Sequence, residues 1–356
     1  MSFSPEIGIK QGREATMRIN RQWRIARRPA GLARESDFEW REDPVPAPGP
    51  GQVLIRNQYL LLNPTNRVWM RQEDTYLPAQ PLGSVMRGFT IGVVEQSRNA
   101  AFPEGSLVTG ALGWQDFAVT DGASDFLIPI PENSEISTAL HLGLLGHGGM
   151  TAYFGLLDIG KPRGGETLVV SSAAGGVGSL VGQIGKLYGC RVVGITGSDE
   201  KCRWIVENLG FDAAINHRSE PVFKRLKDHC PRGIDIYFDN VGGNTLEDVL
   251  NLINDRARLI VCGMLALYND VGGSLTLPAG PNNLLNLMVR RARMEGFLVL
   301  DYRDRFEEAV EAILGWYQAG KIRYRLNIVE GLRNAPHAMT RVFNGSNSGN
   351  LVVKMS

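Results

Sequence analysis

The chain has 356 residues, 43% of them hydrophobic, with a formal net charge of +1. This length predicts two domains, each with enough apolar residues for its own core. The near-zero charge gives no electrostatic reason to expect a nucleic acid or an anionic membrane as a partner. No apolar run approaches the length of a membrane span, and the first thirty residues lack a signal-peptide core. We therefore expect a cytoplasmic protein.

Cysteine and histidine usage bears on disulfides and metal sites. The cysteines are Cys190, Cys202, Cys230 and Cys262, and they show no CxxC spacing. This pattern argues against a disulfide framework and a structural zinc site. Residues 1–140 contain neither Cys nor His. A catalytic zinc held by an N-terminal β domain would need such ligands, so we expect no metal.

Residues 20–145 are predicted to be mostly β-structure. Short alternating runs at 21–27, 52–62, 90–95, 107–111 and 116–119 are separated by turn-forming clusters such as the proline-rich segment 44–51. A small barrel or curled sheet is the economical arrangement of such strands. Near Thr138 the pattern changes to helical spacing, with Leu140, Leu144 and Leu145 on one face. We place a domain boundary there.

Residues 166–201 organise the rest of the chain. A strand-like run at 167–170 is followed by a glycine-rich turn, a helical segment to Leu187 and a second strand at 191–196. Within the turn, Gly175 leaves room for a pyrophosphate, and Gly178 allows a helix to pack closely on the strand. The free N–H groups of that helix would hold the phosphate. Ala173 stands where the motif usually has its first glycine. The prediction of a dinucleotide site therefore depends on the strand before the turn and on the helix and strand after it.

The end of the second strand indicates which dinucleotide is bound. An NAD site usually has an acidic residue there for the ribose 2′-hydroxyl, but residues 195–198 read Ile-Thr-Gly-Ser. Lys201 begins the next helix, where its ammonium group suits a 2′-phosphate, and His217 follows the third strand as a possible second donor. The alternative for Lys201 is a solvated surface lysine, and for His217 the two interpretations are nearly balanced.

Alternating strands and helices continue to about residue 300. Further strands are predicted at 213–217, 235–239, 258–262 and 294–300, which makes a doubly wound sheet. A long amphipathic helix is expected at 305–319. Strands at 324–329 and 351–354 then return toward the N-terminal sheet.

Several segments carry a resemblance to a known family. They include NRQW at 20–23, GWQD at 113–116, LGLLG at 142–146, GMTAY at 149–153, SAAGGVG at 172–178, EKC at 200–202, DNVGG at 239–243, CG at 262–263, YN at 268–269, RARM at 291–294 and NSG at 347–349. The chain resembles the zinc-independent medium-chain dehydrogenase/reductases. Within them it is similar to the branch of NADPH-dependent alkenal double-bond reductases, prostaglandin reductases and bacterial curcumin reductases.

The resemblance implies an α/β fold in which a doubly wound Rossmann sheet is inserted into a GroES-like β-barrel catalytic domain. The expected limits are 1–145 for the first part of the catalytic domain, 146–320 for the NADPH-binding domain and 321–356 for the return. It also implies a homodimer. The cofactor-binding positions that it implies are Met150, Thr151, Gly175, Gly176, Val177, Gly178, Ser198, Lys201, His217, Asn240, Cys262, Gly263, Tyr268 and Asn347.

The candidate catalytic residues are Tyr268, Thr65 and His147. The resemblance places Tyr268 near the substrate carbonyl, where a neutral hydroxyl suits a developing enolate; the alternative is a tyrosine packed at the domain interface. Thr65 stands where the family's DPYMR segment has tyrosine, and His147 with Gly148 replaces Met-Pro. His147 is either a pocket donor near neutral pH or, as we favour, a structural histidine.

Three functions remain open at this level. The first is an NADPH-dependent reductase that transfers hydride to the β-carbon of α,β-unsaturated ketones or aldehydes. The second is a quinone or carbonyl reductase on the same scaffold. The third is an NADPH-binding protein without turnover, which the presence of Lys201, Asn240, Tyr268 and Asn347 makes the least favoured.

Overall fold

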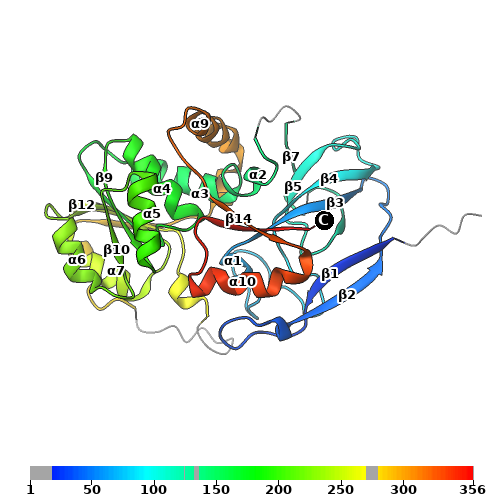
Figure 1. The fold of residues 1–356 in the computed structure, drawn as a ribbon, viewed down its shortest axis with the longest axis horizontal. Coiled ribbons are helices and arrows are strands. Elements are labelled where there is room, and N and C mark those ends of the chain that lie inside the picture. The colour runs from blue at the N-terminus through cyan, green and yellow to red at the C-terminus, as the bar shows by residue number, and fades with distance from the viewer. Residues whose placement is uncertain (1–17, 124, 132–135, 270–279, 356) are drawn as a thin grey trace, which may run out of the picture.

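The computed structural model describes residues 18–123, 125–131, 136–269 and 280–355. These residues form two lobes, one built from the middle of the chain (green to yellow) and the other from its two ends (blue, cyan and red) (Figure 1). The first lobe is built on a six-stranded sheet and the second on a seven-stranded sheet. A separate two-stranded sheet pairs β1 (Ile19–Ile25) with β2 (Phe38–Pro44) in antiparallel orientation. The predicted α/β class is confirmed.

The six-stranded sheet is parallel throughout, in the order β10-β9-β8-β11-β12-β13. Its strands are β8 (Thr167–Ser171), β9 (Arg191–Thr196), β10 (Ala213–Asn216), β11 (Ile234–Asp239), β12 (Ile253–Val261) and β13 (Arg293–Gly296). Every residue of β8 is buried, as expected for a central strand covered on both faces. The strand order reverses between β8 and β11, and sheets of this kind bind ligands beyond the carboxyl ends of the strands at that point.

Helices cover both faces of this parallel sheet. The helices of this lobe are α3 (His147–Phe154), α4 (Gly176–Leu187), α5 (Asp199–Leu209), α6 (Val222–His229), α7 (Gly243–Leu250), α8 (Leu285–Val289) and α9 (Phe306–Gln318). Alternate strand residues enter two different cores: Val170 packs with side chains of α3, α4 and α9, whereas Val169 packs with side chains of α6 and α7. This alternation follows from the two-residue repeat of a strand.

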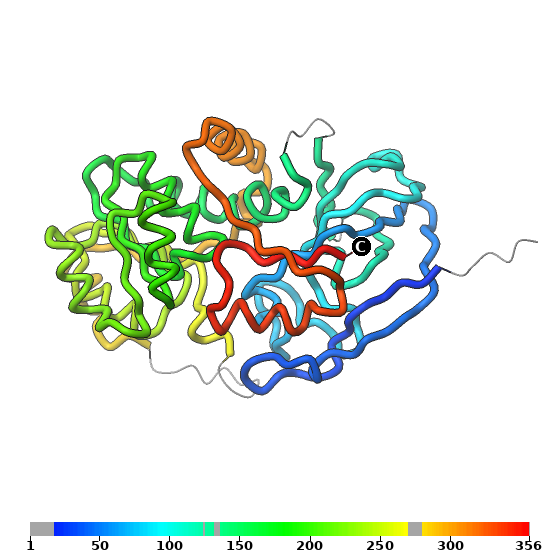
Figure 2. The backbone as a smooth tube through the Cα atoms, viewed as in Figure 1, coloured from blue at the N-terminus to red at the C-terminus, as the bar shows by residue number. Residues whose placement is uncertain are grey.

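The seven-stranded sheet joins the two ends of the chain. Its strands are β3 (Val53–Leu62), β4 (Thr90–Ser97), β5 (Leu107–Gly110), β6 (Phe117–Thr120), β7 (Ile128–Pro129), β14 (Leu326–Glu330) and β15 (Asn350–Lys354). The strand β15 pairs antiparallel with β3, with Leu351 opposite Leu62 and Lys354 opposite Tyr59. Figure 2 shows the red C-terminal segment running back into this sheet. The predicted return of the tail to the N-terminal sheet is therefore confirmed.

Three α-helices also belong to this second lobe and the junction. They are α1 (Thr65–Trp69), α2 (Leu140–Gly143) and α10 (Ala335–Asn344). Neither α1 nor α10 was predicted, and the strands β2 and β7 were not predicted either. The run predicted as one strand at 294–300 is also wrong in part. Its strand ends at Gly296, and Val299–Arg305 form a 3₁₀ helix because Val299 and Tyr302 pack against the core beneath α3 rather than beside another strand.

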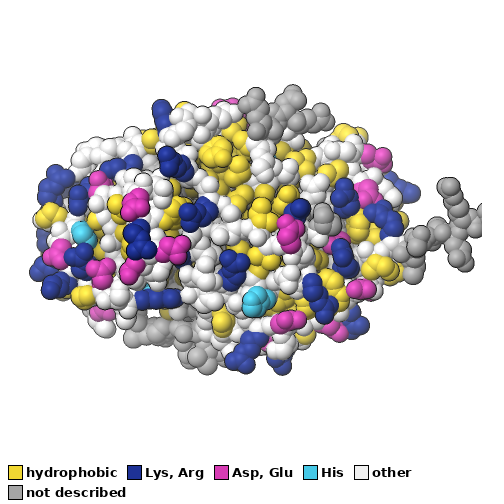
Figure 3. All heavy atoms as spheres, viewed as in Figure 1, with side chains coloured by type: hydrophobic (Ala, Val, Ile, Leu, Met, Phe, Trp, Pro, Cys, Tyr) yellow, Lys and Arg dark blue, Asp and Glu magenta, His cyan; other side chains and the backbone are white. Residues whose placement is uncertain are grey.

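The surface agrees with the near-neutral composition. On the face drawn in Figure 3, basic and acidic side chains are interspersed with apolar ones, and neither sign forms a large field. Within the described residues, no helix combines the length and apolar character that a membrane crossing requires.

Candidate functional site

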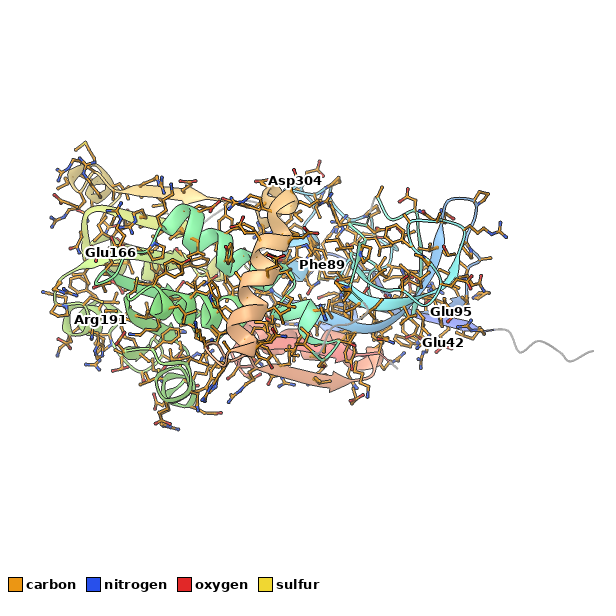
Figure 4. The ribbon with its side chains drawn as sticks, turned by 90° about the horizontal axis from the view of Figure 1, so that it is seen from above. Glu42, Phe89, Glu95, Glu166, Arg191 and Asp304 are labelled. Carbon is orange, nitrogen blue, oxygen red and sulfur yellow. The ribbon has the colours of Figure 1, made fainter. Side chains whose placement is uncertain are left out.

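A cavity of about 890 Å³ lies between the two lobes. One wall is formed by residues that follow β8, β9, β11 and β12, and the other by α1, the segment around Phe89 and the C-terminal return. Figure 4 shows Phe89 at the middle of the molecule, between the lobes. The predicted site residues that line the cavity are Thr65, His147, Thr151, Gly175, Gly176, Val177, Gly178, Lys201, His217, Asn240, Cys262, Gly263, Tyr268 and Asn347.

The glycine-rich turn after β8 has the geometry expected of a phosphate cradle. Gly175 caps the N-terminus of α4, so the free N–H groups of this helix face the cavity. A Cβ at Gly178 would lie 2.4 Å from the carbonyl oxygen of Ser172, which explains why α4 can pack so closely on the turn. A Cβ at Gly176 would lie 1.6 Å from Oδ1 of Asn350. Larger side chains would therefore fill the cradle or push it apart.

The C-terminal return closes one side of this cradle. The backbone N–H of Gly349 donates to the carbonyl oxygen of Ala174 over 2.7 Å, and Gly175 forms an isolated parallel bridge with Gly349. Nδ2 of Asn347 donates to the carbonyl oxygen of Gly349 over 3.2 Å. Gly349 has a φ of +73°, which favours glycine. The predicted cofactor residue Asn347 therefore lies beside the glycine-rich turn, because its own segment, which begins more than 160 residues further along the chain, pairs with that turn.

Basic side chains gather at the end of β9. Nζ of Lys201 donates to the carbonyl oxygen of Gly345 over 2.8 Å, and Nη2 of Arg218 donates to that of Asn344 over 2.7 Å. A Cβ at Gly345 would lie 3.1 Å from Nη2 of Arg218 and 3.9 Å from Nζ of Lys201. The two cations therefore flank the same short stretch of backbone.

His217 completes this basic cluster of Lys201, His217 and Arg218. A Cβ on Gly197 would lie 3.3 Å from Nε2 of His217 and 3.5 Å from Nε of Arg218. Burial and then the charge of Arg218 lower the pKa of Lys201. Burial, Arg218 and Lys201 lower the pKa of His217. The cluster is therefore a set of mutually repelling bases, which an anion with more than one negative charge would relieve.

Two predicted cofactor residues do not line the cavity. Met150 is 2% exposed and packs in the core beneath α3. Ser198 is the N-cap of α5, and its Oγ accepts from the backbone N–H of Lys201 over 3.3 Å. Met150 was predicted to bind the cofactor from family resemblance alone. Its apolar side chain, on a buried helix, enters the core instead. Ser198 contributes by fixing the helix that carries Lys201.

The loops that follow β8, β11 and β12 are tied together. Nδ2 of Asn240 donates to the carbonyl oxygen of Ser171 over 2.7 Å, and its backbone N–H donates to Oγ of Ser171 over 2.8 Å. The backbone N–H groups of Cys262 and Gly263 both donate to the carbonyl oxygen of Asp239, over 2.9 and 3.0 Å. Burial raises the pKa of the Cys262 thiol to about 12, so this thiol stays protonated near neutral pH. The arrangement gives the cavity a rigid floor.

Tyr268 lies over this floor. Its hydroxyl oxygen accepts a hydrogen bond from the backbone N–H of Met264 over 3.2 Å, and a Cβ on Gly263 would lie 3.2 Å from the same oxygen. Burial raises the pKa of Tyr268, so the phenol is neutral near pH 7. Nη2 of Arg71 reaches across the cleft to the carbonyl oxygen of Leu267 over 2.9 Å. Because the phenol oxygen already accepts a bond, its own proton is available to an acceptor in the cavity.

The catalytic-domain wall contains Thr65 and His147. Thr65 begins α1 and lines the cavity. The ring of His147 stacks on Phe89 with centroids 4.0 Å apart and meets Phe306 edge-on at 6.1 Å. Burial, with the nearby charge of Arg303, lowers the pKa of His147 to about 4. Its imidazole is therefore neutral near pH 7, which argues for the packed histidine rather than a proton source.

Several cavity residues were missed from the sequence. Arg218, Tyr76, Trp69, Arg87 and Asn350 all line the cavity. A basic residue directly after His217 was a signal that could have identified Arg218. The others lie in loops or at element ends whose approach to the cleft depends on how the lobes meet, so no local pattern predicts them.

No metal centre is formed by the described part of the chain, because it contains no group of three or more His, Cys, Asp or Glu side chains suited to a metal ion. All four cysteines are free thiols. The candidate chemistry of the cavity therefore rests on hydroxyl, amide and basic side chains.

Comparisons with known proteins agree with this site. Residues 21–128 match a family model described as the N-terminal domain of oxidoreductase, and residues 176–315 match one described as zinc-binding dehydrogenase. The chain is 43% identical to the NADPH-dependent curcumin reductase of Escherichia coli, over 95% of this chain and 97% of that protein. It is 37% identical to the NADP-dependent 2-alkenal reductase of Nicotiana tabacum, over 95% and 98% of the two chains.

The fold is also similar to that of a solved structure. The crystal structure of CurA from Vibrio vulnificus in complex with NADPH is 40% identical to this chain, covering 94% of it and 99% of that protein, with a TM-score of 0.88. The matches cover nearly the full length of the chain. The parallel sheet with its glycine-rich turn and the second sheet with its C-terminal return are consistent with them. The chain belongs to the medium-chain dehydrogenase/reductase family, in the branch of NADPH-dependent double-bond reductases.

Proposed function

We propose that this protein is an NADPH-dependent ene-reductase that acts on the C=C bond of α,β-unsaturated ketones or aldehydes. The observation that carries the proposal is the cavity itself. At one end it has a phosphate cradle and the basic cluster, and at the other end it has the neutral phenol of Tyr268 over a floor made by Asn240, Cys262 and Gly263. The curcumin reductase and the 2-alkenal reductase are similar to this chain over nearly their full length.

The residues present fit NADPH. The turn at Gly175, Gly176 and Gly178 leaves no room for side chains, as a pyrophosphate at the N-terminus of α4 requires. Lys201, His217 and Arg218 provide positive charge for the 2′-phosphate, and no carboxylate ends β9 to repel it. Asn347 on the C-terminal return covers the cradle from the other lobe.

At the reacting end, NADPH when bound supplies a hydride for the β-carbon of the substrate. As the electron pair of the C=C bond moves toward the carbonyl oxygen, that oxygen gains negative charge. The Tyr268 hydroxyl is suited to donate to it, because its own oxygen is held by the Met264 N–H and its raised pKa keeps the proton on. A proton joins the α-carbon afterwards. The stacked Phe89 and His147 rings give the pocket an apolar side wall.

We also propose a homodimer formed through the parallel sheet. The strand β13 is the last in its sheet order, and the neighbouring helix α8 exposes apolar side chains, with Leu285 at 65% and Met288 at 70% exposure. Among the described residues this strand edge is unpaired, and an unpaired edge beside an apolar helix suits a second copy of this chain. The measurement is mass by light scattering, where a monomer in the wild type would contradict the proposal. Met288→Glu should shift a dimer toward monomer.

Three further expectations stay proposals. The domain limits of 1–145, 146–320 and 321–356 are supported by the pairing of β15 with β3. A cytoplasmic location is supported by the free thiols. Zinc independence is supported by the lack of Cys and His in residues 1–140.

The experiment that tests the function is an NADPH-oxidation screen over enones, enals, quinones and simple ketones. We expect turnover of enones and enals with the carbonyl retained in the product. An alcohol product that keeps its double bond would support a carbonyl reductase instead, and turnover confined to quinones would support a quinone reductase.

A further inference from the structure

A side chain of the catalytic lobe holds the loop that carries Tyr268. We call residues 263–269 the Tyr268 loop. Nη2 of Arg71 donates to the carbonyl oxygen of Leu267 over 2.9 Å, in a partly buried position. Arg71 follows α1 in one lobe, whereas Leu267 ends the short 3₁₀ helix that follows β12 in the other lobe. This contact lies behind the lining of the cavity, so it acts on the site without touching a molecule bound there.

The carbonyl group that Arg71 binds belongs to the peptide unit that leads into Tyr268. The C=O of Leu267 and the N–H of Tyr268 lie in one rigid plane. That N–H donates to the carbonyl oxygen of Leu265 over 3.3 Å. One side of the peptide plane is therefore held from within the Tyr268 loop and the other side from the opposite lobe. Together the two bonds fix the direction in which the Tyr268 side chain starts.

On its own side, the Tyr268 loop is tied to the Rossmann lobe through its backbone. The N–H of Leu265 donates to the carbonyl oxygen of Asn240 over 3.2 Å, and the N–H of Ala266 donates to that of Val241 over 3.0 Å. Among the hydrogen bonds of the described residues, the Arg71 bond is the one that joins this loop to the catalytic lobe. Arg71 therefore sets the position of the loop relative to the substrate-side wall.

Arg71 starts from a backbone that is itself held in place. Its N–H donates to the carbonyl oxygen of Val68 over 3.1 Å, which continues the last turn of α1. Nη1 of Arg28 donates to the carbonyl oxygen of Met70, directly before it, over 3.3 Å. The same helix begins with Thr65 in the cavity wall. One short helix thus places both a part of the wall and the cation that holds the facing loop.

We propose that Arg71 is a positioning residue that fixes the direction of the Tyr268 hydroxyl from the opposite lobe. The inference rests on the proposed ene-reductase function, in which that hydroxyl donates to the oxygen of the forming enolate. Arg71 touches neither substrate nor cofactor, and no bond or proton changes at it. Its effect on the reaction passes through Tyr268, because stabilisation of an oxyanion depends on how well the donor is aimed.

The first test removes the guanidinium and keeps an unbranched side chain. Arg71→Met is compared with Arg98→Met, a control at an exposed arginine after β4 in the same lobe. We expect kcat for an enone to fall about fivefold in Arg71→Met, which is less than in Tyr268→Phe, because misplacing a donor costs no more than removing it. The control should keep the wild-type kcat, and the affinity for NADPH should change in neither variant. A wild-type kcat in Arg71→Met would overturn the proposal.

A double variant separates positioning of Tyr268 from a general structural role. In the Tyr268→Phe background, Arg71→Met should have little further effect on kcat, because the hydroxyl that Arg71 directs is already missing. A structural role independent of Tyr268 predicts the same fivefold loss in both backgrounds. That second result would contradict the proposal.

The conservative variant Arg71→Lys tests whether a cationic donor is what the loop requires. Lysine keeps the positive charge and an N–H donor on an unbranched chain, although it lacks the planar guanidinium. We expect kcat in Arg71→Lys to stay within about twofold of the wild type. A loss as large as that of Arg71→Met would show that the bond to Leu267 is not the cause.

A binding measurement gives a readout that does not depend on turnover. 4-Nitrophenolate is a planar oxyanion that mimics an enolate, and its absorbance reports binding to the enzyme in the presence of NADP⁺. Its dissociation constant should rise about fivefold in Arg71→Met and at least as much in Tyr268→Phe, but not in Arg98→Met. Equal affinity in the wild type and in Arg71→Met would show that Arg71 does not direct the phenol.

The outcomes distinguish this inference from the proposed function. If the wild type reduces enones at the C=C bond but Arg71→Met behaves as the wild type, only the role of Arg71 is wrong. If the wild type reduces no enone or enal, the proposed function fails and the inference fails with it.

Discussion

The two ends of the cavity differ in how the chain builds them. The main part of the cofactor end is formed by one continuous segment, because the cradle, the cap at Ser198 and the cation Lys201 lie within residues 166–201. His217, Arg218 and the C-terminal return complete it. The substrate end brings together α1, the Tyr76 segment, the start of α3 and the loop that carries Tyr268. A local segment can be recognised from its spacing, whereas an assembled wall depends on the meeting of two lobes. The second end is therefore where specificity can change without altering the fold.

The cofactor end gives the largest expected effect. A charge-assisted contact to phosphate contributes about 1.5 to 3 kcal/mol, so Lys201→Ala should raise KM for NADPH by about 10- to 150-fold. KM for NADH should change little, because it lacks the 2′-phosphate. Lys201→Arg, which keeps the charge, is the control and should retain most of the preference for NADPH. Steady-state kinetics with both cofactors measure this. Equal losses with NADPH and NADH would show that Lys201 does not contact the phosphate.

The substrate end should respond in kcat rather than in cofactor binding. Tyr268→Phe deletes one hydrogen-bond donor to the developing oxyanion and should lower kcat about tenfold or more. The dissociation constant of NADPH should stay close to that of the wild type. Stopped-flow and fluorescence titration measure the two quantities. If the variant turns over at the wild-type rate, Tyr268 is a packed residue at the domain interface.

His147 tests whether the substrate-side wall is neutral and buried. Its pKa is lowered to about 4 in the folded protein, against about 6.5 in an unfolded chain. The unfolded state therefore binds more protons between these values, and the stability due to this residue is present above pH 6.5 and is lost as the pH falls toward 4. Between pH 7.5 and 5.5 the wild type should lose about 1 kcal/mol more than His147→Gln does.

Urea unfolding at both pH values measures this loss. The control is His337→Gln, which makes the same substitution at an exposed histidine on α10. The other histidines are common to all three proteins, so the difference isolates His147. An equal loss in wild type and His147→Gln would show that the pKa of His147 is not lowered in the folded protein.

The smallest expected effect is that of metal removal. Neither end of the cavity contains a metal-binding cluster among the described residues. Prolonged dialysis against a chelator should leave the rate of enone reduction unchanged. Stoichiometric zinc in the purified protein, lost together with activity, would contradict zinc independence.

The same contrast explains what could be predicted from sequence. The turn at Gly175 and Gly178 was predictable because a strand pattern, closely spaced glycines and a helix pattern follow one another along the chain. The strand positions were predictable from apolar runs. The helix α10 was missed although Ala335, Ala338 and Met339 have helical spacing and are buried, because Pro336 and a polar context masked the pattern. Trp40 lies in β2 among charged residues, which hid that strand.

The candidate site shows the limits more clearly. Met150 was predicted to bind the cofactor from resemblance, but the residue faces the core. Thr65 stands where relatives carry a tyrosine, so the sequence indicated the loss of a pocket hydroxyl. No spacing rule connects residue 65 with residue 76. Tyr76 lines the cavity from a segment without regular secondary structure, and such a segment leaves no periodic signature in the sequence.

The most direct test of the central claim is the fate of the transferred hydrogen. The enzyme is incubated with an enone and NADPH that carries deuterium at C4, and the product is analysed by NMR and mass spectrometry. The account predicts a saturated ketone with one deuterium at the β-carbon and an intact carbonyl group. Deuterium at the carbonyl carbon, in an allylic alcohol that keeps its double bond, would contradict it.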